Sequence, residues 1–133
     1  MNRQQEIKIA ELLNLAIWIR DNVDSMEIDE VKKQIGLLAE YQVLSSRQMS
    51  AIVNNRVSHG VISKIIDKAN KTGGNLNVGT LEILRNVLYS RASGETDFKL
   101  IQEALGKGTS QGMISKLTGV SQSTISRRAN SGR

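Results

Sequence analysis

Apolar residues recur at three- and four-residue spacings along most of the 133-residue chain, which is the period of an amphipathic helix. The chain has no proline and only four aromatic residues, so aliphatic side chains dominate its apolar set. Both features favour helices over a sheet, and we expect an all-α fold. The pattern predicts helices over about residues 5–23, 29–42, 46–53, 58–69, 80–91, 97–105, 109–118 and 121–128.

The first predicted helix, over residues 5–23, carries apolar side chains almost all the way round. They are Ile7, Ile9, Leu12, Leu13, Leu15, Ile17, Trp18 and Ile19. A helix that is apolar on every side is buried on more than one side. We therefore expect this helix to be either a central packing element or a dimer interface.

Residues 109–128 form the most informative stretch of the chain and predict a helix-turn-helix. The expected offsets are filled by Thr109 as first N-cap, Gly119 as helix stop, Val120 in the corner, Ser121 as second N-cap and Ile125 facing inward. In this motif the second helix lies in the major groove of DNA.

The second helix of this pair leaves a polar and basic face outward. Short hydrogen-bonding side chains followed by cations suit base edges flanked by phosphates. The alternative is a generic amphipathic hairpin with a solvated polar face. The DNA-contacting candidates are Ser121, Gln122, Ser123, Thr124, Ser126, Arg127 and Arg128, together with Lys116 of the first helix.

An earlier stretch, residues 46–69, repeats this arrangement in weaker form, with Ser46 and Ser58 as the two predicted N-caps. Residues 57–64 align with residues 120–127 at a constant offset of 63. We interpret this match as a tandem duplication of a helical unit that ends in a helix-turn-helix. Chance similarity between two amphipathic helical segments is the alternative.

The duplication divides the chain into two predicted repeats. The first covers residues 1–71 with a degenerate helix-turn-helix at about 46–69, and the second covers residues 72–133 with its helix-turn-helix at 109–128. In the first corner Arg56 stands where the second has glycine, so Asn54 or Asn55 is expected in the left-handed conformation. The DNA-contacting candidates of the first hairpin are Arg47, Ser58, His59, Val61, Ser63 and Lys64.

The net charge of +5 is concentrated in the two hairpins. Residues 47–71 carry a net charge of +4, and residues 106–133 carry five basic and no acidic side chains. The other two segments are acidic, with −3 over residues 1–46 and −1 over residues 72–105. Clustered cations that neutralise phosphates supply most of the sequence-independent affinity for DNA, so the charge coincides with the predicted motifs.

Several other functions lack the residues that they need. There is no cysteine, the single histidine, His59, has no partner ligands nearby, and no Ser/His/Asp set or phosphate loop occurs. We therefore expect no enzyme activity, no metal and no cofactor. No leader and no uncharged stretch long enough to span a bilayer is recognisable, so we expect a cytoplasmic, nucleoid-associated protein with no membrane partner.

Residues 100–133 resemble the DNA-reading part of the Trp-repressor-like superfamily. The shared features are Ser110-Gln111, the corner Gly119-Val120, the run Thr124-Ile125-Ser126-Arg127 and Asn130-Ser131. The hairpin also resembles those of phage repressors and resolvase DNA-binding domains. The resemblance implies that Thr124, Ser126 and Arg127 contact DNA. Members of that family dimerise through their helices, whereas this chain already contains two candidate readers. Arg128 stands where that family has a small residue beside its corepressor, so no small-molecule effector is expected.

Together these features predict a sequence-specific double-stranded DNA-binding protein, a small bacterial or phage transcriptional repressor that reads DNA with two hairpins in one chain. A homodimer that uses one hairpin per chain is the structural alternative. The functional alternatives are a DNA-packaging adaptor of the small terminase type and a regulatory module that docks on RNA polymerase. Steep loss of binding with salt would distinguish DNA binding from the last of these.

Overall fold

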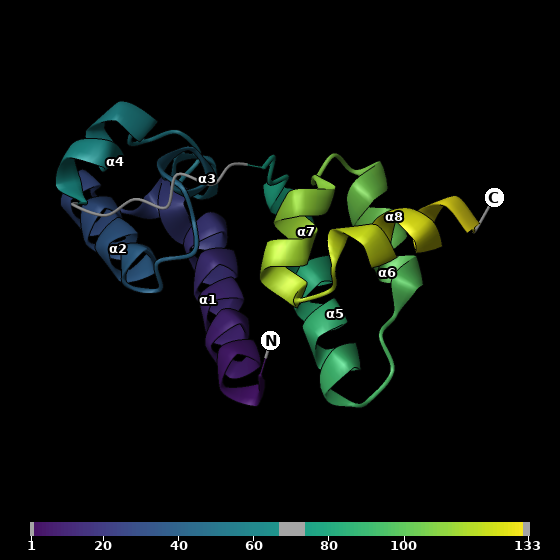
Figure 1. Ribbon diagram of the computed structural model, residues 1–133. Coiled ribbons are helices and arrows are strands. Elements are labelled where there is room, and N and C mark those ends of the chain that lie inside the picture. Colours follow the sequence, from purple (N-terminus) through teal and green to yellow (C-terminus); the bar gives the residue numbers. More distant parts are fainter. Residues whose placement is uncertain (1, 67–73, 132–133) are drawn as a thin grey trace. The chain divides into compact units, whose positions relative to one another are not determined.

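The computed structural model describes residues 2–66 and 74–131, and every regular element within these ranges is helical (Figure 1). The all-α prediction is therefore confirmed. None of these helices combines the length and the apolar character that crossing a bilayer requires. In chain order the elements are α1 (Arg3–Asn22), η1 (Val23–Ser25), α2 (Ile28–Glu40), α3 (Ser46–Ile52), α4 (His59–Ile65), η2 (Val78–Thr80), α5 (Leu81–Ala92), α6 (Phe98–Gly106), α7 (Gln111–Thr118) and α8 (Gln122–Ser131).

Internal contacts divide the chain into two compact units. One comprises residues 1–13 and 74–133, and the other comprises residues 14–73. Helix α1 contributes residues to both units. The α7–α8 pair belongs to the first unit and the α3–α4 pair to the second, so each predicted hairpin lies in a unit of its own.

Helix α1 is buried along a single stripe. The buried residues recur at helical spacing and are Ile9, Leu12, Leu13, Ala16 and Ile19, followed by Val23 just beyond the helix. Ile7 and Trp18, by contrast, are 52% and 50% exposed, and the polar Glu11 and Asn14 between them are exposed as well. Within one chain the face that carries Ile7, Glu11 and Trp18 is not buried, so the expectation of a central packing element is wrong at these positions. The alternative, a dimer interface, stays a prediction.

Helices α5 to α8 pack together around an aliphatic core. Helix α5 lies against α6 and α7, and α8 lies against α6 and α7. Spacings of three and four residues direct the apolar side chains of each helix to one side. The buried residues are Leu81, Leu84, Val87, Leu88, Ile101, Ala104, Met113, Ile114, Leu117 and Ile125.

The N-caps of α3 and α7 each lie one residue away from the predicted position. Ser110 caps α7 by accepting a hydrogen bond from the Met113 amide, and Ser45 caps α3 in a reciprocal capping box with Gln48. The predictions of Thr109 and Ser46 are therefore wrong. Each helix start has two consecutive hydroxyl residues. Ser46 and Thr109, the two that do not cap, are buried.

Thr109 joins the start of α7 to the segment that precedes α5. Its hydroxyl oxygen lies 2.7 Å from the Thr80 hydroxyl oxygen and accepts a hydrogen bond from the Asn77 amide. The Asn77 side chain donates in turn to the Lys107 carbonyl at 2.6 Å, and the Ser110 amide donates to the Asn75 carbonyl. Residues 75–80, of which only the last lies in a predicted helix, thus hold the entry to α7.

The corner between α7 and α8 has the predicted conformation. Gly119 is left-handed, with φ 80° and ψ 0°, and its amide closes α7 on the Ser115 carbonyl. Val120 is buried next to it, and Ile125 is buried one turn into α8. Glycine has no Cβ to clash in this conformation, which lets the chain turn within three residues.

Replacing Gly119 with alanine should lower the free energy of unfolding by about 1–2 kcal/mol, because the left-handed conformation strains any residue with a Cβ. Chemical denaturation of the two proteins measures the difference. Gly106→Ala is the matched control, since Gly106 ends α6 with no atom within 4 Å of an added Cβ. It should be neutral or slightly stabilising. Equal losses in both variants would contradict the role of the corner.

Candidate nucleic-acid interface

Helix α8 presents most of the predicted contact residues on one surface. The Ser121 hydroxyl caps the helix by accepting from the Thr124 amide at 3.2 Å, and Ile125 turns fully into the core. The exposed side chains are those of Ser121, Gln122, Ser123, Arg127 and Arg128, and those of Thr124 and Ser126 are half-buried. A helix with one inward apolar residue and an outward polar face is therefore present where the sequence predicted it.

The hydroxyl groups at the start of α8 are ordered by one another. Ser121 Oγ lies 2.7 Å from Thr124 Oγ1 and 3.3 Å from Ser123 Oγ. Ser121 thus serves the helix cap and its neighbours, whereas Gln122 extends from the same turn as an exposed amide. A side-chain amide has hydrogen-bond donors and an acceptor, so it can pair with the donors and acceptors of a base edge.

The predicted cations of this hairpin are not equivalent. Arg127 is exposed, whereas Lys116 is half-buried in the last turn of α7, and burial lowers the pKa of its ammonium group. Desolvation disfavours the charged form of a lysine. Arg127 is therefore the better placed of the two to meet a phosphate.

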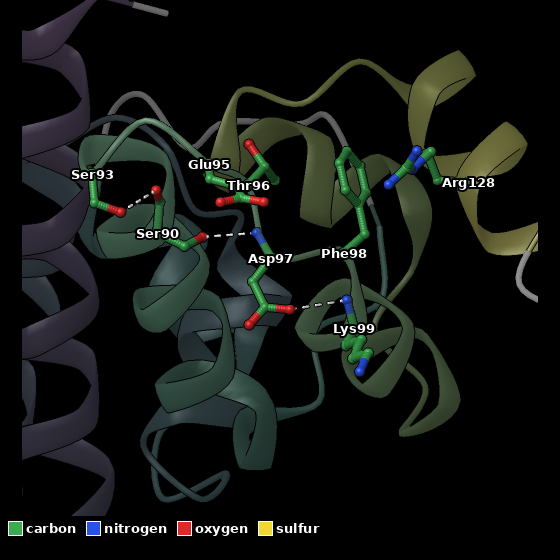
Figure 2. Close-up of a pocket in the computed structure, with 8 residues that line it drawn as sticks. All are labelled: Ser90, Ser93, Glu95, Thr96, Asp97, Phe98, Lys99 and Arg128. Atoms are coloured by element: carbon green, nitrogen blue, oxygen red, sulfur yellow. Dashed lines mark hydrogen bonds between the residues drawn. The ribbon is translucent and has the colours of Figure 1, made fainter.

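Arg128 points toward a neighbouring helix. Its guanidinium carbon lies 4.4 Å from the centre of the Phe98 ring, at the start of α6 (Figure 2). The pair borders an open depression of about 400 Å³ whose other lining residues are Ser90, Ser93, Glu95, Thr96, Asp97 and Lys99. Nothing in the local sequence around Arg128 indicated this partner, because the two residues are 30 positions apart.

The α3–α4 pair resembles the later hairpin in its caps and buried positions. Ser58 caps α4 by accepting from the Val61 amide, and Val57 and Ile62 are buried. Helix α4 ends at Ile65, because Ile66 is extended with φ −108° and ψ 124°. The prediction of helix at residue 66 is wrong, and the predicted continuation over 67–69 lies outside the described residues.

The corner of this first pair is longer and lacks glycine. Asn54 and Asn55 are both left-handed, with φ 55° and 58°, so the expectation for these asparagines is confirmed. Asparagine tolerates this conformation better than most residues with a side chain. The Ser50 hydroxyl donates to the Val57 carbonyl at 2.9 Å and closes the corner from inside.

Arg56, which stands where the second corner has glycine, has a structural role that the sequence did not reveal. Its guanidinium donates to the backbone carbonyls of Val23 and Met26, and the neighbouring Asn54 donates to the Asp24 carboxylate at 3.1 Å. These contacts attach the corner to the turn that follows α1. Arg56 is thus engaged within the protein, and the basic charge that α3 and α4 expose comes from Arg47 and Lys64.

The outward face of α4 is more apolar than that of α8. Val61 and Ile65, one helical turn apart, are 41% and 43% exposed. The Ser63 side chain is exposed, and its hydroxyl lies 2.9 Å from both the Ser46 hydroxyl and the His59 carbonyl. His59 is exposed beside them. The Ser63 hydroxyl therefore has hydrogen-bond partners within the α3–α4 pair.

The described residues contain no group of three His, Cys, Asp or Glu side chains that could hold a metal ion. Comparison of the chain with protein-family models, with curated proteins and with solved structures finds no match in any of the three. A functional assignment therefore depends on the geometry and charge of the two hairpins.

Replacing Arg56 with alanine should lower the free energy of unfolding by about 1.5–3 kcal/mol, the range for hydrogen bonds that involve a charged group. Thermal or chemical denaturation followed by circular dichroism measures the loss. Arg47→Ala is the matched control, because Arg47 is an exposed arginine of the same hairpin and its removal should change stability by less than about 0.5 kcal/mol. An Arg56 variant as stable as this control would show that the corner does not depend on the guanidinium.

Proposed function

We propose that this chain binds double-stranded DNA and places α8 in the major groove. The observation that carries the proposal is the face of α8, where Gln122, Ser123 and Arg127 are exposed while Ile125 anchors the helix from behind. An α-helix fits the major groove, and in helix pairs of this kind the first residues of the second helix meet the base edges.

The side chains on this face match the chemistry of a duplex. Glutamine can make paired hydrogen bonds to the N6 and N7 atoms of adenine, serine accepts or donates to any base edge, and arginine binds phosphate or guanine. Residues 106–133 contain no acidic side chain that would repel the phosphates. The resulting attraction is independent of sequence, and the polar face of α8 would add selectivity.

We propose that α3 and α4 form a second reader, related to α7 and α8 by duplication. The caps Ser58 and Ser121 differ by 63 positions, and the caps Ser45 and Ser110 differ by 65. The two extra residues fall in the longer asparagine corner. Equivalent buried positions, Val57 with Val120 and Ile62 with Ile125, support a common origin.

The biological role that we propose is that of a small transcriptional repressor of bacterial or phage type. A protein that only occupies DNA needs no catalytic group, since repression follows from blocking a promoter. Selection of bound sequences from a random duplex pool tests this role, because a repressor enriches a defined motif. Recovery of unrelated sequences would contradict sequence-specific binding.

Replacing Arg127 with alanine should weaken DNA binding and reduce the slope of log affinity against log salt by about 1, because one phosphate contact is lost. Fluorescence anisotropy titrations of the selected duplex at several salt concentrations measure both effects. The control is Lys32→Ala, which removes an exposed cation of α2 outside both hairpins. If the two variants had equal slopes, α8 would not lie against the DNA backbone.

The apolar face of α4 predicts that the first reader contacts thymine. The C5 methyl of thymine is the apolar group that base edges present in the major groove. Val61 is an exposed apolar residue of α4 that could contact it. Replacing one thymine of the selected site with deoxyuracil should weaken binding about fourfold, the value of one buried methyl group.

The Val61→Ser variant should bind the thymine and deoxyuracil sites equally, as measured by the same titrations. Leu37→Ser is the matched control, because Leu37 is an exposed aliphatic residue of α2, and it should keep the preference for thymine. If the wild type bound tightly and no thymine-to-deoxyuracil replacement changed its affinity, α8 would be the helix that reads bases. It would also favour a protein partner for the face formed by Val61 and Ile65.

A further inference from the structure

We infer that Arg128 is a positioning residue, which holds α8 against α6 through Phe98, and that it does not serve as a phosphate contact. This inference rests on the proposed function, because it assigns different tasks to two adjacent arginines of the same helix. Arg127 would meet the DNA, and Arg128 would fix the helix that carries Arg127.

The geometry that supports this division is the cation–π contact between α8 and α6. The guanidinium carbon of Arg128 stands 4.4 Å from the Phe98 ring centre, well within the distance of about 6 Å at which such contacts are attractive. Figure 2 shows the guanidinium facing the ring from α8, while the Lys99 side chain of the same depression points away from the ring. Two cations, Lys99 and Arg128, line this depression, and it is Arg128 that faces the Phe98 ring.

A second contact at the same place joins the two helices. The Gln102 side-chain amide, one turn beyond Phe98 on α6, donates to the Arg128 carbonyl at 3.4 Å. Asp97 fixes the start of α6 by accepting from the Lys99 and Leu100 amides, so Phe98 is presented from an ordered helix end. Both the side chain and the main chain of Arg128 are therefore directed toward α6.

Helix α8 needs such a support because it has few apolar residues. Ile125 is its buried anchor, and Arg128 follows three residues later, which places it on the same side of the helix. One anchor leaves a helix free to swing about that point. A second contact one turn away restricts the swing and thereby sets where the exposed face of α8, including Arg127, is directed.

Salt dependence separates a positioning residue from a phosphate contact. We would titrate the selected duplex with wild type, Arg127→Ala, Arg128→Ala and Phe98→Leu at several salt concentrations. Arg127→Ala should lower the salt slope by about 1, the contribution of one phosphate contact. Arg128→Ala and Phe98→Leu should each weaken binding by about two- to fivefold with the slope unchanged, and the double variant should be no weaker than either.

The matched control is Lys99→Ala, which removes a cation from the same depression and leaves the stacked pair intact. It should change neither the affinity nor the slope. A conservative variant, Phe98→Trp, should preserve affinity because tryptophan offers a stronger ring face. A salt slope that falls in Arg128→Ala as it does in Arg127→Ala, with Phe98→Leu neutral, would overturn the inference and make Arg128 a phosphate contact.

Unfolding measurements keep this inference distinct from the proposed function. A double-mutant cycle on Phe98 and Arg128 should show a coupling of about two- to fivefold in the unfolding equilibrium constant, whereas Phe98 and Arg127 should show none. Absence of coupling between Phe98 and Arg128 overturns the inference even if DNA binding is strong. Coupling in a chain that binds no duplex would instead overturn the proposed function and, with it, the task assigned to Arg127.

Discussion

The burial of one side chain, Ile125, governs how this protein can present α8. The rest of the described face of that helix is polar or charged, so the helix has little intrinsic reason to stay against the core. Ile125 follows a corner in which Gly119 is left-handed and Val120 is buried, and this corner brings α8 back against the core. Burial of Ile125 leaves the polar side chains of α8, including Gln122, Ser123 and Arg127, exposed to solvent. A small helical unit can in this way offer a polar contact surface.

Polar contacts between segments far apart in the sequence hold each hairpin within its own unit. These contacts could not be predicted from the sequence. Apolar spacing and cap residues act over three or four positions, so they predicted the helices, the Gly119 corner, the Ser121 cap and the left-handed asparagines. The Thr80–Thr109 hydroxyl pair and the Arg56 bonds to Val23 and Met26 join residues about 30 positions apart. Isolated threonines and arginines carry no signal of such partners.

Consecutive hydroxyl residues explain why the sequence misplaced two caps by one position. At Ser45-Ser46 and at Thr109-Ser110 either side chain can cap a helix, and the tertiary packing determines which of the two does. In each case one hydroxyl caps the helix, while the other is buried, with Ser46 paired to Ser63 and Thr109 paired to Thr80. The pair therefore performs two tasks at one helix start, capping the helix and attaching it to a neighbouring segment.

The second helices of the two hairpins have similar caps and buried positions, but their exposed side chains differ. Helix α8 exposes the Gln122 amide, the Ser123 hydroxyl and Arg127, whereas α4 exposes Val61 and Ile65 beside Lys64. A symmetric pair of readers would require matching side chains at these positions. If both helices bind one duplex, the two halves of the site must differ, with polar base edges favoured under α8 and methyl groups under α4. The asymmetry thus follows from exposed side chains, which the caps and buried positions do not constrain.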